Sequence, residues 1–300
     1  MTHLENNLKH YLELIETAIQ QWATPANALP KRLHEAMDYS MAAGGKRLRP
    51  LLVLASHALF PSATDPLPAA VAVECMHTAT LIHDDLPILD NSDLRRGIPT
   101  CHKHFDAPTA LLAGDALMIY PFSLLSKAYI EDTALALDLV SILSEASGST
   151  ELIGGQMEDI QAESEAFVPN NPDNAARIEY IHLHKTASLM AACIEMGLRL
   201  STAPKELYPV GQTLGLELGL MFQIVDDILD TASDTETLGK PAGLDEKNGK
   251  LTYPRLFGIE ASKQKATEHL HKALKALEAL QCQDPSFLKA LMEQMLARSY

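Results

Sequence analysis

The spacing of apolar residues is the feature that most constrains the fold of this chain. Long Ala-, Leu- and Met-rich segments carry apolar residues every three or four positions, which is typical of helices. Val, Ile and Thr nowhere alternate with polar residues over a useful length, so no strand is predicted. Proline and polar residues separate the segments at 24–30, 61–68, 168–174 and 201–207. We therefore expect one all-α domain over residues 1–300, a bundle of about ten or more helices with room for a central cavity.

The charge of the chain limits its partners. A net charge of −15 over 300 residues argues against nucleic acid, because phosphate backbones require a basic surface. A small anionic ligand remains compatible with this charge if a divalent cation binds with it. The four cysteines are scattered without a CxxC pair, so neither a disulfide framework nor a zinc cage is expected. No signal peptide and no segment of about 20 apolar residues is recognised, and we expect a soluble cytoplasmic protein with no stable membrane insertion.

The first acidic motif, HDDLPILD, follows the apolar segment that begins after 61–68. Asp84 and Asp85 are predicted to lie at the end of that helix. Pro87 disturbs regular winding, so Asp90 can turn back toward the other two carboxylates. Taken alone, such a cluster could also be an acidic helix end exposed to water.

The second acidic motif, VDDILD, contains Asp226, Asp227 and Asp230. The first and last of these lie four residues apart, on one face of a helix. Like charges at that spacing destabilise a helix unless a cation binds between them. Carboxylates without a neighbouring His or Cys suit Mg²⁺, which prefers oxygen ligands. The presence of two such motifs, each among apolar residues, favours metal sites over two solvated helix faces.

Two basic segments accompany the carboxylates. In AAGGKRLRP, two glycines let the backbone approach a ligand, and Lys46, Arg47 and Arg49 provide cations for phosphate oxygens. The alternative is a helix end followed by surface cations. Arg95 and Arg96 are adjacent, and adjacent side chains diverge by about 100° on a helix. They are therefore expected to contact two different anions, one bridged by metal and one held by cations alone, as a pair of diphosphates would be.

With these residues identified, the chain resembles the trans-isoprenyl diphosphate synthase family, in particular its bacterial farnesyl diphosphate synthase type. The resemblance covers nearly the whole length and rests on six motifs in order: GGKRLRP, LIHDDLPILDNSDLRRG, GGQMEDI, HKTASL, FQIVDDILD and LGKPAGLDEKNGKLTYP. It implies an all-α bundle around a deep cavity and a homodimer. It also implies isopentenyl diphosphate and allylic diphosphates as substrates, with dimethylallyl and geranyl diphosphate as allylic starters and farnesyl or geranylgeranyl diphosphate as product.

The resemblance also implies roles for single residues. Three Mg²⁺ ions would be coordinated by Asp84, Asp90 and Asp226, supported by Asp85, Asp227 and Asp230. The allylic diphosphate would contact Arg95, Lys185 and Lys240. The isopentenyl diphosphate would be held without metal by Lys46, Arg49, His77 and Arg96. Thr186 and Gln223 would face the reacting carbons with Gln156 and Asp159 nearby, Phe222 would pack on the isopentenyl group, and Lys250 would add positive charge near the site.

The implied chemistry is electrophilic alkylation. Cations stabilise the leaving diphosphate while the C–O bond ionises to an allylic cation, which the isopentenyl double bond attacks. An apolar cavity would shield the cation from water. No general base from the protein is required, in agreement with the lack of a nucleophile–His–Asp pattern.

Product length is where the sequence departs from the farnesyl-forming pattern. Bacterial members of that type usually carry an aromatic residue five positions before the first Asp, and here that residue is Ala79, followed by Thr80. A small side chain there would leave the tunnel open, with Met76 as a deeper floor, so that C20 is a candidate product beside C15. A bulky residue from a neighbouring helix could instead close the tunnel.

Two other enzyme classes and a non-catalytic subunit share part of this motif pattern. A class I terpene cyclase or a squalene-type synthase would share the first acidic motif but would not need a second basic diphosphate site. Cyclases also typically carry an Asn/Ser/Glu-type second metal motif where this chain has DDILD. A non-catalytic synthase subunit commonly loses one acidic motif, and both are intact here.

Overall fold

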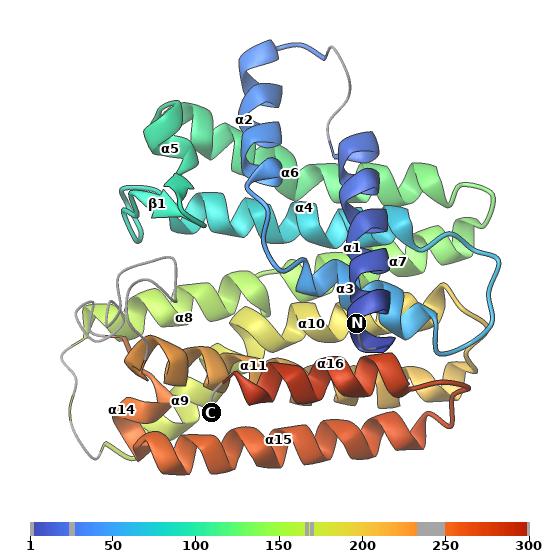
Figure 1. Cartoon of the computed structure of the whole chain (residues 1–300). Helices are drawn as coiled ribbons and strands as arrows, with labels where there is room; N and C mark the ends of the chain where they lie inside the picture. Colours follow the sequence, from blue (N-terminus) through green and yellow to red (C-terminus); the bar gives the residue numbers. More distant parts are fainter. Residues whose placement is uncertain (1–2, 24–27, 166–167, 169–170, 233–249, 299–300) are drawn as a thin grey trace. The chain divides into compact units, whose positions relative to one another are not determined.

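The protein is described by a computed structural model that covers residues 3–23, 28–165, 168, 171–232 and 250–298 (Figure 1). Two compact units are distinguished. The first comprises residues 1–54 and 64–141, and the second comprises residues 55–63 and 142–300. Most of the described chain is helical, as the apolar spacing predicts.

The first unit contains most of the N-terminal helices and one small hairpin. Its elements are α1 (His3–Trp22), α2 (Lys31–Ala42), α4 (Leu67–Asp84), β1 (Leu94–Arg95), β2 (Ile98–Pro99), α5 (Cys101–His104) and α6 (Ala107–Ala128). Two further helices, α3 (Leu48–His57) and α7 (Thr133–Ser147), span the division between the units. The prediction of a helix beginning after the break at 24–30 is confirmed by α2.

The second unit holds the remaining helices. Its elements are α8 (Leu152–Ser164), α9 (Asp173–Ile181), a π-helical segment η1 (His182–Ala187), α10 (Ser188–Arg199), a 3-10 turn η2 (Lys205–Leu207), α11 (Tyr208–Ala232), α14 (Tyr253–Phe257), α15 (Ile259–Ala279) and α16 (Ser286–Ala297). Helix α11 packs against α10, η1, α15 and α16, and α15 and α16 lie side by side (Figure 1).

Helix α4 is the centre of the first unit. Its sequence is almost entirely apolar or small, and it is buried over most of its length. It packs against α1, α2 and α6, which agrees with the expectation that helices apolar on more than one side are central. Because α4 carries the first acidic motif at its C-terminal end, a densely packed helix fixes where that motif begins.

Two expectations from the sequence were wrong. The strands β1 and β2 form an antiparallel pair, with Arg95 opposite Ile98, and each strand is only two residues long, too short to show an alternating pattern. Helix α6 is long and apolar enough, by length and composition, to cross a membrane. It packs along α4, and a long core helix of a folded unit has the same length and composition.

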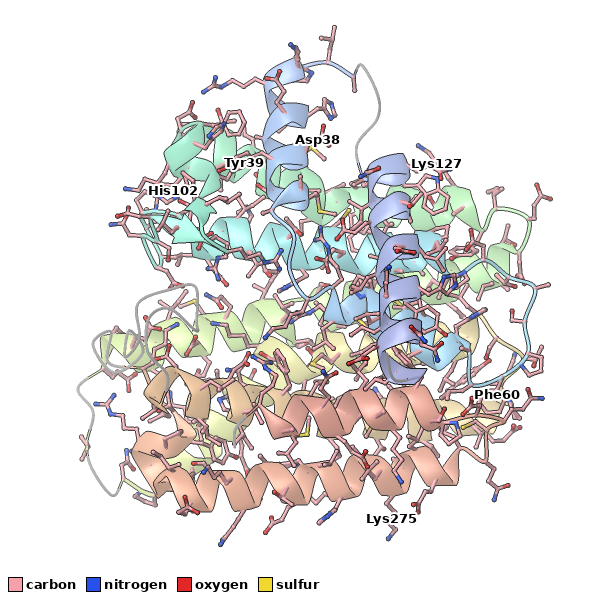
Figure 2. The ribbon with its side chains drawn as sticks, viewed as in Figure 1. Asp38, Tyr39, Phe60, His102, Lys127 and Lys275 are labelled. Carbon is pink, nitrogen blue, oxygen red and sulfur yellow. The ribbon has the colours of Figure 1, made fainter. Side chains whose placement is uncertain are left out.

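Small aromatic and polar clusters cover the outer end of the first unit. Tyr39 of α2 stacks on His104 with ring centroids 4.2 Å apart, and its hydroxyl donates to the carbonyl of Pro99. Tyr39 and His102 are labelled among the side chains in Figure 2. These contacts attach the hairpin and α5 to α2, so they hold the segment that carries Arg95 and Arg96.

Candidate active site

The chain reverses direction directly after α4. Asp84 is the last residue of that helix, and its carbonyl accepts a hydrogen bond of 2.9 Å from the backbone N–H of Asp90. A second backbone bond, from Asn91 to Leu86, closes the same turn. The prediction that Asp90 turns back toward the helix end is therefore confirmed at the level of the backbone.

Arg95 and Arg96 belong to the hairpin and not to a helix. Arg95 is in β1, and Arg96 and Gly97 form the two-residue turn, both with positive φ (54° and 80°). Such a turn matches the twist of the flanking strands. The two arginines diverge, because their guanidinium groups contact different partners, Asp85 and the carbonyl of Gly44. That each of them contacts a different anion stays a prediction. The hairpin produces this divergence, instead of the assumed helix.

Arg95 forms an ion pair with the buried Asp85. Its guanidinium Nη2 lies 2.5 Å from Oδ1, and its Nε donates to the same carboxylate. Burial raises the pKa of Asp85 above its usual value, against the lowering effect of Arg95. The pKa of Arg95 is raised despite burial, because Asp85, Asp84 and Asp90 stabilise its charge. Arg95 therefore lies within the field of all three carboxylates of the first motif.

Arg96 instead contacts the glycine loop between α2 and α3. Its Nη1 donates to the carbonyl of Gly44. A Cβ added at Gly45 would lie 2.4 Å from the guanidinium carbon of Arg96, so any larger residue there would displace this side chain. Gly45 also has a φ of 121°, which L-residues rarely adopt. The two glycines thus provide the backbone conformation and the space that Arg96 needs.

His77 lies about two turns before Asp84 on α4, among cations. Burial and the charges of Arg49, Arg96, Arg95 and Arg47 hold the pKa of His77 well below its usual value. The His77 side chain is half-buried, so partial burial and neighbouring charge together lower its pKa. A neutral imidazole can still donate one N–H to an anion.

Lys185 is held by the second unit through close packing of α8 on η1. A Cβ added at Gly155 would lie 2.2 Å from the backbone nitrogen of Lys185, so only glycine permits this approach. One turn further along α8, the buried Asp159 accepts a 2.6 Å hydrogen bond from the Lys185 ammonium. Although burial alone would raise it, Lys185 and Lys250 hold the pKa of Asp159 below its usual value.

A chain of hydrogen bonds joins η1 to α11. The Thr186 hydroxyl donates to Oε1 of Gln223 at 2.9 Å, and the Gln223 amide donates to Oδ1 of Asp227 at 3.1 Å. The other Asp227 oxygen accepts from the backbone N–H of Tyr253 at 3.0 Å and lies 3.3 Å from Nε2 of His182. The Asp227 carboxylate is therefore used to fix Gln223 and Thr186 in place.

The remaining second-unit residues lie on or near α11. Asp226 is partly exposed and lies 3.6 Å from Nη2 of Arg298, at the end of α16. Asp230 is buried, whereas Phe222 is half-buried. Lys250 pairs with Glu163 at 3.5 Å. Lys240, which the resemblance places on the allylic diphosphate, lies outside the described residues.

The carboxylates of the two motifs differ from a preassembled metal site. Among the described residues, no three His, Cys, Asp or Glu side chains converge as a ready-made metal cage. In each motif the aspartates offer oxygen donors only. Mg²⁺ is usually held by one or two carboxylates together with substrate phosphates and water. The donor set therefore fits Mg²⁺ bound with a diphosphate, and does not fit a metal held by protein alone.

The chain-length residues lie within α4. Ala79 has 0% and Met76 has 1% of its surface exposed, so both are buried. Thr80 is partly exposed, and its hydroxyl donates to the carbonyl of His77. The small side chain at position 79 is thus enclosed by its neighbours in this structure.

Sequence reasoning missed several residues of the site. His182 and Tyr253 contact Asp227, and Arg298 contacts Asp226. Glu74, three residues before His77, is buried against Arg47. A lone acid within the apolar segment VAVECM was the available signal for Glu74, because a buried acid requires a partner. The contacts of Arg298 join residues 72 positions apart, and no local pattern indicates them.

Comparison with known proteins gives consistent matches along the chain. A family model for polyprenyl synthetases matches residues 30–294. A farnesyl diphosphate synthase of Micrococcus luteus is 41% identical over 293 residues, covering 97% of each chain. The chloroplastic geranylgeranyl pyrophosphate synthase 3 of Arabidopsis thaliana is 44% identical, covering 86% of this chain and 71% of the relative.

A solved structure supports the same likeness. The crystal structure of a geranyltransferase from Helicobacter pylori, complexed with magnesium and isoprenyl diphosphate, superposes with a TM-score of 0.81. It is 34% identical, and the match covers 100% of this chain and 97% of that one. The helical fold class predicted from the sequence is thereby confirmed.

Proposed function

The chain belongs to the polyprenyl synthetase family, and from this premise we propose how its residues divide the work of joining two diphosphate substrates. The protein is a short-chain trans-prenyltransferase that condenses isopentenyl diphosphate with allylic diphosphates to give farnesyl or geranylgeranyl diphosphate. The family match includes parts of both compact units, which supports treating residues 1–300 as one polyprenyl synthetase domain. No disulfide joins the four cysteines, all of which are described, and this supports a cytoplasmic location.

The observation that carries the proposal is the divergence of Arg95 and Arg96. Arg95 faces the carboxylates of the first motif, where a metal-bridged diphosphate would add negative charge that needs a cation. Arg96 faces the glycine loop, with Arg49 and His77 nearby. We assign Arg95 to the allylic diphosphate and Arg96 to the isopentenyl diphosphate.

Each assignment includes further residues. Lys185, together with Lys240 outside the described residues, is proposed to contact the allylic diphosphate. Lys46, Arg49 and His77 are proposed to hold the isopentenyl diphosphate. Phe222 packs on the isopentenyl group in this proposal, and Lys250 adds positive charge. Lys185 already carries a carboxylate partner, which keeps its ammonium in one position before substrate arrives.

Magnesium is proposed to bind with the allylic diphosphate, through Asp84 and Asp90 of the first motif and Asp226 of the second. Three Mg²⁺ ions is the number expected for this family. When bound, they neutralise the charge that develops on the leaving diphosphate. Asp85 and Asp227 are already engaged by Arg95 and Gln223, so these two, with Asp230, are assigned to supporting the ligands.

The polar oxygens of η1 and α11 are proposed to stabilise the allylic cation. Oε1 of Gln223 accepts a hydrogen bond from the Thr186 hydroxyl, and the amide nitrogen of Gln223 donates one to Asp227. The two side chains therefore keep fixed dipoles, which stabilise charge without reorganising during the reaction. In this proposal the side chains of the site bind and orient the two substrates and exclude water. No side chain is assigned as general base.

Exchange of each arginine tests the division of substrates. We expect Arg95→Gln to raise KM for geranyl diphosphate and Arg96→Gln to raise KM for isopentenyl diphosphate, each by about tenfold or more. Arg32→Gln removes an exposed arginine paired with Asp106 and should change neither value. If both arginine variants affect the same substrate, the assignment is wrong.

For product length we propose farnesyl diphosphate, C15, as the main product. The support is the burial of Ala79 and Met76, since a longer chain would need space that neighbouring side chains occupy. Geranylgeranyl diphosphate would then form only where these neighbours move. Met76, Ala79 and Thr80 remain the proposed determinants of chain length.

We further propose that the outer face of α6 pairs two copies of the chain. Leu112 and Ile119 are 57% and 69% exposed and lie two turns apart, on one face of the helix. Leu111 beside them is also exposed. A second copy would cover this apolar strip in the homodimer that the family resemblance implies. Light scattering should give a dimer mass for the natural protein and a monomer mass for Leu112→Glu/Ile119→Glu; a dimer in both would overturn the assignment.

A further inference from the structure

Arg47 differs from the two cations beside it, because it points into the first unit. Its side chain is 0% exposed, whereas Lys46 is exposed and Arg49 half-buried. It makes four hydrogen bonds: two to the Glu16 carboxylate at 2.7 and 3.3 Å, one to Glu74 at 2.7 Å, and one to the carbonyl of Met41 at 2.7 Å. Its donors are thus engaged by protein, and Arg47 is not available to a diphosphate.

The backbone at Arg47 explains why such an anchor is needed. Arg47 has a φ of 48°, a left-handed conformation that is uncommon for residues other than glycine. Gly44 and Gly45, just before it, also have positive φ. The carbonyl of Arg47 accepts from the N–H of Leu51 in the first turn of α3, which begins at Leu48. The two ion pairs of the buried Arg47 guanidinium hold this unusual turn in a single conformation, with residues 46 and 49 on either side of it.

The two carboxylates come from different helices. Glu74 belongs to the central helix α4 and is 1% exposed, whereas Glu16 belongs to α1 and is 45% exposed. Helix α1 lies before residue 30, where the family match begins. Burial lowers the pKa of Arg96, and the charge of Glu74 opposes this shift. One buried arginine therefore links α1, α4 and the loop that carries Lys46.

We propose that Glu16 and Glu74, acting through Arg47, are positioning residues for isopentenyl diphosphate, and that α1 thereby sets the affinity for this substrate. The inference rests on the proposed function, in which Lys46 and Arg49 bind that diphosphate. Loss of the Glu16 carboxylate leaves Arg47 with one buried carboxylate and loosens the turn. The cations on either side then spend less time in the binding arrangement.

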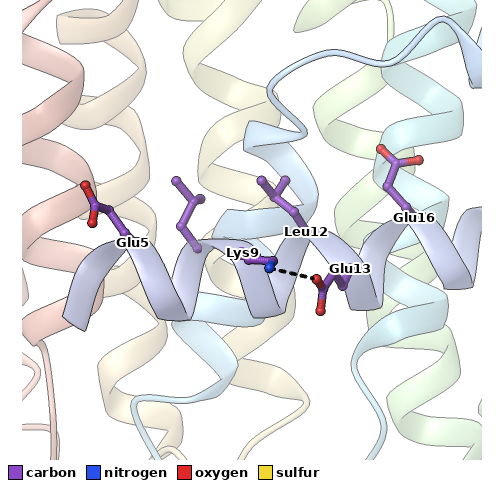
Figure 3. Close-up of a pocket in the computed structure, with 6 residues that line it drawn as sticks. Glu5, Lys9, Leu12, Glu13 and Glu16 are labelled. Atoms are coloured by element: carbon purple, nitrogen blue, oxygen red, sulfur yellow. Dashed lines mark ion pairs between the residues drawn. The ribbon is translucent and has the colours of Figure 1, made fainter. Parts of the chain in front are cut away.

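The experiment compares two glutamates of the same helix. Glu13 and Glu16 both line a surface hollow along α1, but Glu13 pairs with the exposed Lys9 at 3.9 Å (Figure 3). Steady-state kinetics should show that Glu16→Gln raises KM for isopentenyl diphosphate about tenfold, the effect of about 1.4 kcal/mol. KM for geranyl diphosphate and kcat should stay within about twofold. Glu13→Gln should match the natural protein in all three values.

Two further variants distinguish failure of the proposed substrate site from failure of the positioning role. Lys46→Gln should raise KM for isopentenyl diphosphate directly; if it does not, the proposed site is wrong. If Lys46→Gln has this effect and Glu16→Gln behaves like Glu13→Gln, the positioning role alone is overturned. Should Glu16→Gln lower the thermal midpoint, Glu16→Asp restores a carboxylate and is expected to restore KM. Equal KM values in the Asp and Gln variants would contradict the inference.

Discussion

The hydroxyl of Thr186 donates to the side-chain oxygen of Gln223 at 2.9 Å, which joins the π-helical segment η1 to α11. The wider π turn places His182, Lys185 and Thr186 within one short segment. Each of the three contacts a polar partner on another element: Asp227, Asp159 or Gln223. The polar side chains of the second unit are therefore positioned by one another before substrate binds.

Loss of the Asp227 charge should uncouple this arrangement. In Asp227→Asn the Gln223 amide is no longer fixed by a carboxylate, and misplacement of a catalytic dipole by about 1 Å can cost about a hundredfold. We expect kcat to fall by about 10- to 100-fold, without recovery at high Mg²⁺. Glu217→Gln, on the same helix but paired with His269, serves as control. Full recovery by excess Mg²⁺ would instead indicate that Asp227 is a metal ligand.

Mg²⁺ should stabilise the protein only together with a diphosphate. Because no cage of three ligands is preassembled in the described residues, Mg²⁺ alone is expected to shift the thermal midpoint by less than about 1 °C. Mg²⁺ with inorganic pyrophosphate should shift it by about 5 °C or more. Asp84→Asn should abolish this shift, whereas Asp93→Asn, which alters an exposed pair with Lys103, should retain it. An equal shift with Mg²⁺ alone would contradict the account.

Acid should destabilise the protein through His77. The pKa of His77 is well below its usual value because of burial and the neighbouring arginines. The unfolded chain takes up a proton near pH 6.5 and the folded chain does not. The contribution of His77 to the free energy of unfolding is therefore fully present above about pH 6.5. It is lost as pH falls from there toward the pKa that His77 has in the folded protein.

Urea unfolding at pH 7.5 and pH 5.5 measures this effect. His77→Gln should lose less unfolding free energy between the two pH values than the natural protein, by about 1 kcal/mol. His10→Gln replaces an exposed histidine of α1 and should behave as the natural protein does. If all three proteins lose the same unfolding free energy between the two pH values, the pKa of His77 is not lowered in the folded protein.

Space at the level of Met76 should control product length. Met76→Ala removes a fully buried side chain, so we expect a larger share of C20 product and a loss of about 2–5 kcal/mol in stability. Met157→Ala, at an exposed position of α8, should leave both unchanged. Ala79→Tyr should lower the thermal midpoint by overpacking α4. If Met76→Ala gives an unchanged product distribution, Met76 does not limit the length of the product.

Local pattern was sufficient to predict most of the fold. Apolar spacing predicted the helices, and the proline-rich breaks predicted where α2, α4 and α11 begin. The turn after Asp84 was predicted because Pro87 cannot continue the helix. The hairpin at residues 94–99 was not, because two-residue strands leave no alternating pattern and the positive φ of Arg96 carries no mark in the sequence.

The site was predicted less completely, because its contacts are long-range. The two acidic motifs and the basic loop were recognisable as short strings. The partners that fix them were not: Glu16 lies 31 residues from Arg47, and Asp159 lies 26 residues from Lys185. Only packing of separate helices brings these charges together. A run such as GGKRLRP therefore shows three similar cations, while the structure shows one of them buried and two near the surface.

The most direct test of the central claim is the product formed from labelled isopentenyl diphosphate and Mg²⁺. Dimethylallyl or geranyl diphosphate is added as starter, and the hydrolysed products are sized by chromatography. We predict linear, Mg²⁺-dependent products that end mainly at C15. Cyclic products, head-to-head products or no elongation at all would contradict the assigned reaction, and a main product of C20 would contradict the closed packing proposed around Ala79.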